Sequence, residues 1–505
     1  MNIYKYSNKI AKGGFVLFFG MMLGRVLTYI YVVLISKLGS SKYGLLSLGF
    51  AISLFLSTFA LLGLRTGVVR YTSYYLSKKN NRAIKGVIFS SIRLSLPLSL
   101  VLTVFLFIFS KQISLNLFHN PELIPILKLF SLTIPFISLS TLFLSVINGF
   151  QKIEYQTGIK EIFENFIKLI LTFILIYFGY DVLGVAWAYI ISLIVTFILS
   201  FYFLQKKIFS SFISKLKPIL IDKELLLFSL PLIFTGFLVL VIKWVDVFMI
   251  GIFRTTSEVG IYNVALPTAN LLVIVPTALM GLFMPIITEL YSKRKFNDIK
   301  VLSITTSKWI FFVNLPLFFI ILLFSKRILN VAFGSEYVAG YGALLILIFG
   351  YLFHSLTHPY TSVLGVIKKT NLILYIMIVA ALINVLLNYI LIPKIGIIGG
   401  AIATSFSLFI SFLLSAIIVY KLTKINTLET NYFKAIFAGI ISFFIIYSIS
   451  DFFDTNSFFI LISFCLLFLL VYFVFLIIFK SLNEVDKKIL FGFFNGFKKR
   501  IRKTT

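Results

Sequence analysis

The sequence predicts an all-α membrane protein with about fourteen transmembrane helices, and two observations lead to this prediction. Of the 505 residues, 60% are hydrophobic and only 12% are charged, and the mean hydropathy is +1.05. Soluble domains are about half apolar and about one quarter charged. The apolar residues also occur in runs of about twenty, the length that an α-helix needs to cross a bilayer. An ordinary soluble enzyme is therefore excluded.

The apolar windows follow one another along the whole chain. The first six are residues 15–35, 44–64, 84–109, 124–150, 157–178 and 182–204. The next six are residues 225–252, 259–285, 309–324, 343–366, 371–392 and 398–420, and the last two are 432–449 and 458–479. Each window is typical of a transmembrane helix. No small-residue cleavage site follows the first window, so we expect it to remain as a membrane anchor.

The distribution of charge predicts the orientation in the membrane. The net charge is +29, from 46 Lys and Arg against 17 Asp and Glu. Most of the basic residues fall at the N-terminus, in alternate connections and in the C-terminal tail. Because basic residues collect in cytoplasmic loops and attract anionic lipids, we expect a cell (cytoplasmic) membrane protein with both termini cytoplasmic. The same explanation makes a nucleic-acid partner unnecessary.

The connections between windows contain no recognisable catalytic group. No outward-facing loop reaches twenty residues, and none carries paired carboxylates, a Ser/His/Asp set or metal ligands, so the sequence predicts a protein that is not an enzyme. His354 and His358 have i, i+4 spacing, but no carboxylate lies close by in the sequence to complete a metal site. We therefore expect no metal site and no cofactor, apart from a coupling ion, H⁺ or Na⁺.

Short matches recur in order at offsets of 215 to 217 residues, which indicates an internal repeat. For example, Ser41–Leu45 (SKYGL) is matched by Ser257–Ile261 (SEVGI). The repeat predicts an N-terminal six-helix lobe (1–208) and a C-terminal six-helix lobe (209–424) in the same orientation, with a cleft between them that suits alternating access. Two additional transmembrane helices (425–480) and a basic cytoplasmic interfacial tail (481–505) complete the predicted organisation.

Several loose motifs, which cover nearly the whole chain, resemble those of a known group. They are residues 38–44 (LGSSKYG), 63–71 (GLRTGVVRY), 246–251 (DVFMIG) with 259–263 (VGIYN), and 483–486 (NEVD). In these motifs the sequence resembles the oligosaccharide and polysaccharide-lipid flippases of the multidrug/oligosaccharidyl-lipid/polysaccharide exporter superfamily. The resemblance implies a fourteen-helix carrier that moves a polyprenyl-linked glycan from the inner to the outer leaflet. We expect such a carrier to work as a monomer.

One cation lies deep in the first apolar window. Arg25 is ten residues into this window, about 15 Å along a helix and near the middle of a core about 30 Å thick. A charge at this depth is costly unless it faces protein or water, and its own window offers no acid to pair with it. Because a guanidinium donates two hydrogen bonds to phosphate at once, we expect Arg25 to hold the pyrophosphate of the lipid carrier.

Two further windows carry charged faces. Glu161, Glu164 and Lys168 share one helical face in the fifth window, and Lys243 and Asp246 lie close together in the seventh. Lys168 or Lys243 would assist Arg25 in a substrate cavity. Alternatively, Glu164 with Lys168, and Asp246 with Lys243, are ion pairs that hold helices together.

Four polar residues are weaker candidates. Asn384 and Asn388, at i, i+4 spacing in the eleventh window, either donate hydrogen bonds to sugar hydroxyls or join neighbouring helices. Arg65 and Arg70 lie at the predicted cytoplasmic mouth, where they either gather anionic headgroups or follow the general excess of basic residues on that side.

A second function from another class is an H⁺- or Na⁺-coupled multidrug or metabolite exporter of the same superfamily. Such a protein needs membrane carboxylates that bind the coupling ion and an organic cation, and its first helix typically offers an acid. Here the first window offers Arg25 instead. The exporter interpretation therefore depends on Glu161, Glu164 and Asp246.

Overall fold

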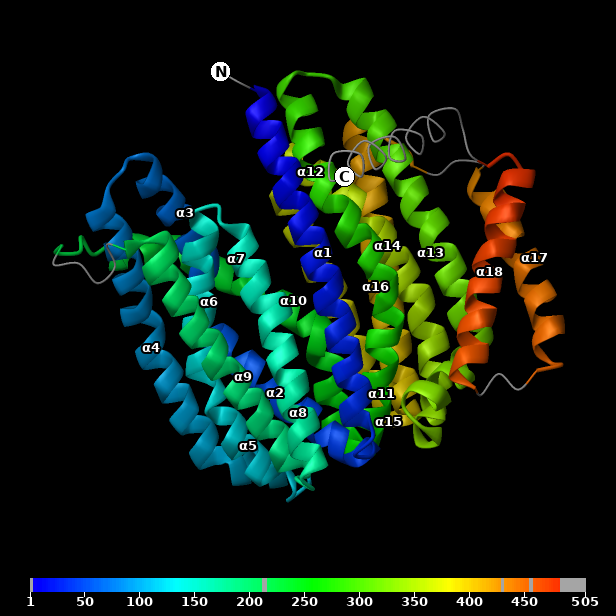
Figure 1. Ribbon diagram of the computed structural model, residues 1–505, viewed down its shortest axis with the longest axis horizontal. Coiled ribbons are helices and arrows are strands. Elements are labelled where there is room, and N and C mark those ends of the chain that lie inside the picture. The colour runs from blue at the N-terminus through cyan, green and yellow to red at the C-terminus, as the bar shows by residue number, and fades with distance from the viewer. Residues whose placement is uncertain (1–2, 211–215, 428–430, 454–456, 482–505) are drawn as a thin grey trace, which may run out of the picture. The chain divides into compact units, whose positions relative to one another are not determined.

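The computed structural model describes residues 3–210, 216–427, 431–453 and 457–481, and within these ranges the regular elements are all helices (Figure 1). The prediction of an all-α protein is therefore confirmed. The α-helices are α1 (Ile3–Ser36), α2 (Ser40–Ala60), α3 (Leu64–Ser77), α4 (Asn81–Gln112), α5 (Leu123–Ser131), α6 (Thr133–Gly149), α7 (Ile153–Thr157), α8 (Glu164–Tyr177), α9 (Val182–Phe203), α10 (Asp222–Phe253), α11 (Thr256–Ala269), α12 (Ile274–Ser292), α13 (Phe296–Ala332), α14 (Tyr341–Val366), α15 (Thr370–Ile395), α16 (Ile397–Thr423), α17 (Asn431–Ser450) and α18 (Phe458–Ile478). Three π-helical segments, η1 (Ile113–Leu117), η2 (Gly158–Phe163) and η3 (Leu204–Ile208), and two 3₁₀ segments, η5 (Asn270–Val273) and η6 (Ser335–Gly340), extend or join them.

Twelve helices in the described part of the chain are long and apolar enough to cross a membrane. The predicted number of fourteen is not confirmed, and the difference lies in two segments. The described apolar part of α1 is Gly20–Ser36, which is shorter than the other spans. The fifth window is a continuous helix formed by α7, η2 and α8, but Lys160, Glu161, Glu164 and Lys168 make it less apolar than the other spans.

The chain divides into two compact units that are described separately. The first contains Met1–Thr268, Ala332–Leu347 and Leu374–Ser407, and the second contains Ala269–Val331, Ile348–Ile373 and Leu408–Thr505. These units follow spatial contact and not duplication, so the predicted boundaries at residues 208, 424 and 480 remain predictions. The predicted tail lies outside the described residues from residue 482 onward.

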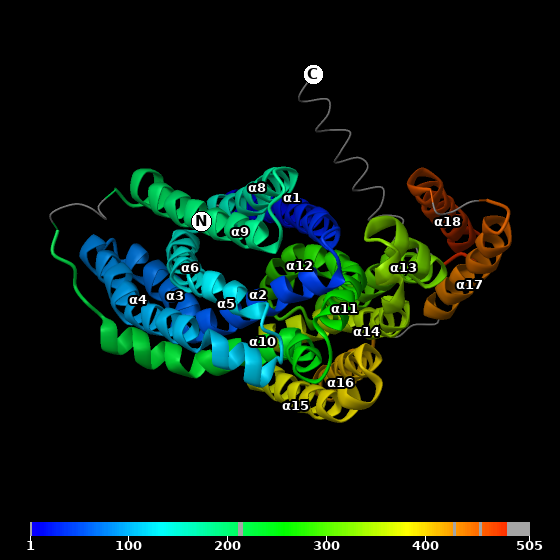
Figure 2. The same ribbon diagram turned by 90° about the horizontal axis from the view of Figure 1, so that it is seen from below.

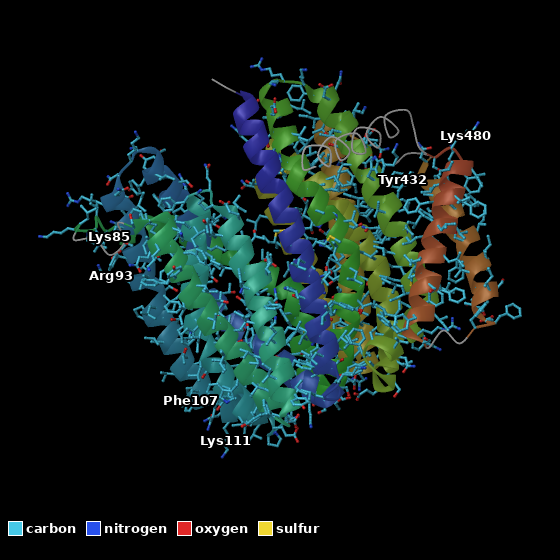
Figure 3. The ribbon with its side chains drawn as sticks, viewed as in Figure 1. Lys85, Arg93, Phe107, Lys111, Tyr432 and Lys480 are labelled. Carbon is cyan, nitrogen blue, oxygen red and sulfur yellow. The ribbon has the colours of Figure 1, made fainter. Side chains whose placement is uncertain are left out.

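In the first unit, α3, α4 and α6 pack around buried aliphatic side chains that include Val68, Ile88 and Leu142. Helix α8 packs along α9, and the two helices lie side by side in both ribbon views (Figures 1 and 2). On α4, Lys85 and Arg93 lie toward one end, whereas Phe107 and Lys111 lie toward the other (Figure 3). Many large apolar side chains between these ends are exposed, as expected for a helix surface that faces lipid.

In the second unit, α17 and α18 pair with each other and pack on α13 (Figure 2). The Tyr472 hydroxyl donates to the Phe312 carbonyl at 3.1 Å. The Phe319 ring lies against Phe468 and over Gly439, where an added Cβ would meet the ring. A small residue at this position allows the helices to approach closely.

The N-terminal ends of α2 and α11, both in the first unit, cross through reciprocal contacts. Ser40 Oγ lies 2.8 Å from Ser257 Oγ, and Ser41 Oγ lies 3.0 Å from Thr256 Oγ1. With the repeat offset of 216, Ser40 corresponds to Thr256 and Ser41 corresponds to Ser257. Each serine therefore contacts the counterpart of its neighbour, which is the pattern of an interface related by two-fold symmetry. We refer to these four residues as the serine crossing.

Two equivalent glycines make the serine crossing possible. A Cβ at Gly44 would collide with the carbonyl oxygen of Thr256, and a Cβ at Gly260 would collide with that of Ser40. The backbones of α2 and α11 are therefore in direct contact, as at small-residue helix interfaces in membranes.

The same symmetry extends to the residues around the serine crossing. Asn120 Nδ2 donates to Thr256 Oγ1 at 3.4 Å, and Glu336, 216 residues later, accepts from the Ser40 backbone N–H at 3.1 Å. The carboxylate of Glu336 thereby satisfies one of the unpaired N–H groups at the start of α2, where the helix dipole favours negative charge.

Candidate functional site

Two cations come together in the first unit, one from α1 and one from α10. Arg25 and Lys243 are both exposed, and they are close enough for their positive charges to repel each other. Neither forms an ion pair within the part of the chain that the structure describes. The sequence predicted both as candidates but gave no reason to place them together, because 218 positions separate them.

The charged face of the fifth window is arranged differently from the predicted pairing. Glu164 accepts from Lys160 with both carboxylate oxygens at 2.7 Å, so the ion pair considered for Glu164 and Lys168 is not formed. Lys168 is buried, donates to Asn165 Oδ1 at 2.9 Å and lies 4.4 Å from the centre of the Tyr31 ring. Lys160 also lies one helical turn from Glu164, and it takes the carboxylate while Lys168 is bonded to Asn165.

The π-helical segment η2 brings Glu161 against α1. A Cβ at Gly24 would lie 2.8 Å from the Glu161 backbone oxygen, so the glycine allows the two segments to approach. The Thr28 hydroxyl donates to the Gly24 carbonyl at 2.8 Å and lies 3.3 Å from Asn165 Oδ1. Local π-helical geometry of this kind occurs frequently at functional sites. Glu161 is therefore next to the helical turn that carries Arg25.

Asp246 lies at the centre of a buried polar cluster formed by α10, α11, α15 and α16. It is 1% exposed, and its carboxylate accepts from Tyr262 Oη at 2.7 Å, Asn388 Nδ2 at 2.6 Å, Asn384 Nδ2 at 3.4 Å and the Thr404 hydroxyl. The ion pair considered for Asp246 and Lys243 is not formed, because Asp246 points into the helix bundle and Lys243 is exposed.

The chemistry of this cluster is that of an acid without a cationic partner. A buried carboxylate needs either a counter-charge or protonation, and all four of its donors are neutral. Asn388 Oδ1 is also buried without a hydrogen-bond partner among the described residues. Oxygen atoms in such a group can hold a proton or a small cation. Sequence reasoning placed Asp246, Asn384 and Asn388 in separate groups and missed Tyr262 and Thr404, although Tyr262 belongs to the VGIYN motif.

The remaining candidates lie elsewhere. Arg65 is exposed at the start of α3, and the Arg70 guanidinium carbon lies 4.2 Å from the centre of the Phe228 ring. The rings of His354 and His358 are adjacent, with centroids 5.2 Å apart. Within the described residues, no group of three or more His, Cys, Asp or Glu side chains is arranged to hold a metal ion.

Two protein-family models match this chain. The model of the polysaccharide biosynthesis protein family matches residues 10–291, more than half of the chain, and the MatE model matches residues 231–390. An uncharacterized membrane protein of Methanocaldococcus jannaschii is 27% identical over 420 residues, which cover 79% of this chain and 81% of that protein. A "probable low-salt glycan biosynthesis flippase" of Haloferax volcanii is 31% identical over 177 residues, 34% of this chain and 37% of the relative.

Solved structures agree in fold. The lipid II flippase MurJ in an inward closed conformation superposes with a TM-score of 0.70 at 20% identity, covering 93% of this chain and 98% of that one. The family matches extend over both halves of the sequence and include the motifs at residues 38–44, 63–71, 246–251 and 259–263. The motif at residues 483–486 lies beyond these matches and outside the described residues. The chain belongs to the polysaccharide biosynthesis protein family of the multidrug/oligosaccharidyl-lipid/polysaccharide exporter superfamily, and it is a multi-pass membrane flippase or transporter.

Proposed function

We propose that this protein flips a polyprenyl-pyrophosphate-linked oligosaccharide from the inner to the outer leaflet of the cell membrane by alternating access. The product would serve assembly of a surface polysaccharide or a glycoprotein glycan. The observation that carries this proposal is that the positive charges of Arg25 and Lys243 repel each other, while neither side chain forms an ion pair among the described residues.

Two adjacent cations in a membrane protein raise the free energy of the unoccupied state, because they repel each other in a medium of low dielectric constant. A ligand with two neighbouring negative charges removes this repulsion, and a pyrophosphate is such a ligand. The Arg25 guanidinium would donate two parallel hydrogen bonds to one phosphate, and the Lys243 ammonium would attract the other phosphate through its positive charge.

The Asp246 cluster supports a separate step, which is coupling to an ion gradient. Its carboxylate has no cationic partner in the described structure and is surrounded by neutral hydrogen-bond donors. Uptake and release of H⁺ or Na⁺ there would change the charge of α10, the helix that also carries Lys243. This cluster likewise favours the second candidate function, a cation-coupled exporter, for which the same acid would be the ion site.

The experiment that separates the two functions is deletion of the gene, followed by mass spectrometry of lipid-linked oligosaccharides and of surface glycans. Accumulation of a completed glycan lipid together with loss of the surface glycan is the expected result. Unchanged glycans in the deletion strain would contradict the flippase proposal and favour the exporter. A plasmid copy of the wild-type gene should restore the original pattern.

A further inference from the structure

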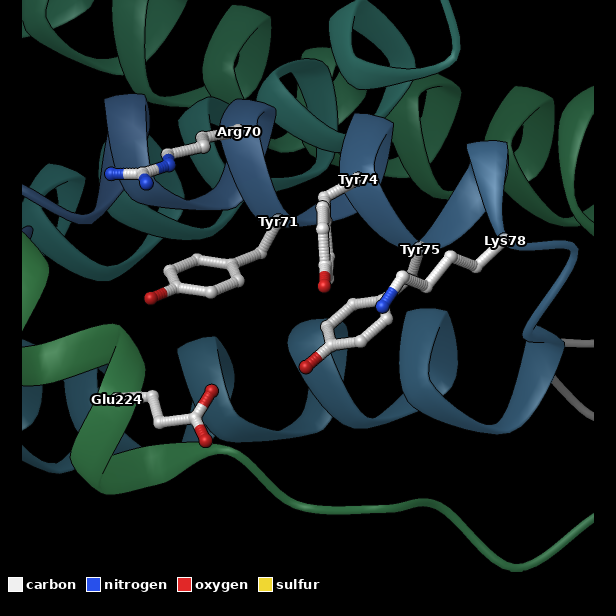
Figure 4. A pocket seen from close by; sticks show the side chains of 6 residues that line it. All are labelled: Arg70, Tyr71, Tyr74, Tyr75, Lys78 and Glu224. Carbon is white, nitrogen blue, oxygen red and sulfur yellow. The ribbon is translucent and has the colours of Figure 1, made fainter.

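A pocket of about 470 Å³ opens between α3 and the start of α10, and neither Arg25 nor Lys243 lines it (Figure 4). Its lining consists of Arg70, Tyr71, Tyr74, Tyr75, Lys78 and Glu224. The volume is within the range of small-molecule sites, about 300–1,000 Å³. Four of these residues come from one face of α3, Lys78 follows the last residue of that helix, and Glu224 of α10 faces them across the pocket. Helix α3 lies outside the candidate membrane spans.

The walls of this pocket are held by close helix packing. A Cβ at Gly67 would collide with the Ser229 side chain, and a Cβ at Gly63 would collide with the Ser229 backbone. Helices α3 and α10 therefore pack closely, through the α10 backbone at Gly63 and through α10 side chains at Gly67. Such contact fixes the separation between the tyrosines on one wall and Glu224 on the other.

The rings of the three tyrosines pack against one another. The rings of Tyr71 and Tyr75 are nearly parallel, at 26° with centroids 6.3 Å apart, and Tyr74 meets Tyr75 edge-on at 5.1 Å. Tyr71 and Tyr75 are half-buried, so their orientation is set by packing. Burial, followed by the negative charge of Glu224, raises the pKa of Tyr75, which keeps its hydroxyl protonated as a hydrogen-bond donor.

The charges at the pocket are arranged to leave the carboxylate of Glu224 available. The Arg70 guanidinium lies over the Phe228 ring, and the Lys78 ammonium lies 4.4 Å from the centre of the Tyr74 ring. Among the described residues neither cation pairs with Glu224. The Glu224 carboxylate is therefore available as a hydrogen-bond acceptor.

We propose that this pocket binds a neutral hexopyranose with a free vicinal diol, as a sugar of the lipid-linked glycan on its way to the cavity. A carboxylate accepts two hydrogen bonds from a vicinal diol, and Glu224 is placed to do so. The C–H face of the sugar carries partial positive charge and stacks on the negative face of the Tyr75 ring. The sugar binding is independent of transport, but its role in the translocation of a glycan rests on the function proposed above.

The test measures sugar binding to the full chain in lipid nanodiscs by saturation-transfer difference NMR. The probes are methyl α-D-mannopyranoside, methyl β-D-glucopyranoside and methyl β-D-galactopyranoside, with their per-O-methylated forms as ligands that lack a diol. We expect saturation transfer to at least one free glycoside and none to its methylated form. Tyr75→Leu should weaken binding by about fivefold through loss of the ring, and Glu224→Gln by about tenfold through loss of the charged acceptor.

Matched controls distinguish the pocket from the rest of the surface. Tyr177→Leu removes an exposed tyrosine of α8, and Glu122→Gln removes an exposed acid before α5; both should bind like the wild type. Tyr75→Phe keeps the ring if Tyr75→Leu does not fold, and it should retain most of the binding.

Several results would overturn the inference. These are the absence of saturation transfer to all three free glycosides, equal transfer in the Glu224→Gln variant, and displacement of the sugar by inorganic phosphate or by anionic lipid in the disc. The deletion experiment is unaffected by any of them. A strain that accumulates glycan lipid while the purified chain binds no glycoside would contradict the pocket alone.

Discussion

At the scale of single residues, Arg25 is the side chain on which the flippase proposal depends most. Arg25→Ala should abolish glycan export in the deletion strain, because the remaining Lys243 ammonium supplies one charge but cannot donate two parallel hydrogen bonds to a phosphate. Arg25→Lys should restore export only partly. The measurement is the amount of surface glycan, normalised to the amount of protein in the membrane.

Arg93→Ala is the matched control for this change. Arg93 is exposed and pairs with Asp222 at 3.4 Å, and exposed ion pairs contribute about 0–1 kcal/mol, so export should remain normal. Normal export by a well-expressed Arg25→Ala protein would refute the role assigned to Arg25.

The Asp246 cluster permits a prediction about stability. Tyr262→Phe removes one hydrogen bond to a buried carboxylate and leaves the ring in place, so we expect a loss of about 1.5–3 kcal/mol. The measurement is the midpoint of thermal unfolding of the purified protein in detergent, which this loss of stability should lower. Tyr177→Phe, on an exposed ring, should leave the midpoint unchanged. An unchanged midpoint for Tyr262→Phe would show that the hydroxyl does not stabilise Asp246.

The partners of these residues were not predictable from local spacing. The sequence placed Asp246 next to Lys243 and Glu164 next to Lys168, since these pairs share helical faces. In the structure Asp246 is bonded to Asn388, 142 residues away, and Glu164 to Lys160. A single helix offers several equivalent neighbours, and only the contacts between helices decide which of them has its charge satisfied.

At the scale of helices, the contact between α2 and α11 requires glycine at two positions. Gly44→Val or Gly260→Val should prevent the approach of these helices, because the new Cβ would meet backbone that cannot move aside. We expect export to fall by about tenfold or more while the protein still inserts in the membrane. Cysteines placed at residues 40 and 257 should then no longer cross-link.

Gly365→Ala is the control for this change, because a Cβ there meets nothing within 4 Å. If both valine variants export normally and cross-link as the glycine protein does, α2 and α11 do not need to touch.

At the scale of the whole molecule, the proposed alternating access predicts that the serine crossing opens during each cycle. In a Cys465→Ser background, cysteines at residues 41 and 256 should form a disulfide under oxidation, given the 3.0 Å between the native hydroxyl oxygens. Export should stop in the oxidised protein and return after reduction. Each single cysteine variant should export normally under both conditions. Continued export by the fully cross-linked protein would contradict alternating access at this crossing.

At this larger scale, the sequence predicted the class of fold. Composition and apolar windows predicted the helical membrane fold, because the bilayer imposes both length and polarity on each segment. The number of spans was less certain, since the fifth window carries four charges that make it less apolar than the other spans. The pocket beside Tyr71 was also missed, because Glu224 lies more than 140 residues beyond α3 and was not associated with it.

The reciprocity of the serine crossing has a consequence for how the two copies of the repeat could diverge. After a duplication, most positions of one copy face different neighbours from their counterparts and are free to drift separately. At the crossing, each copy packs directly against the other, so a bulky residue in either copy disturbs the packing of both. The stretches 41–45 and 257–261, which first revealed the repeat, lie at this contact. One of the matches that indicate the repeat is therefore located where the two predicted copies are in contact.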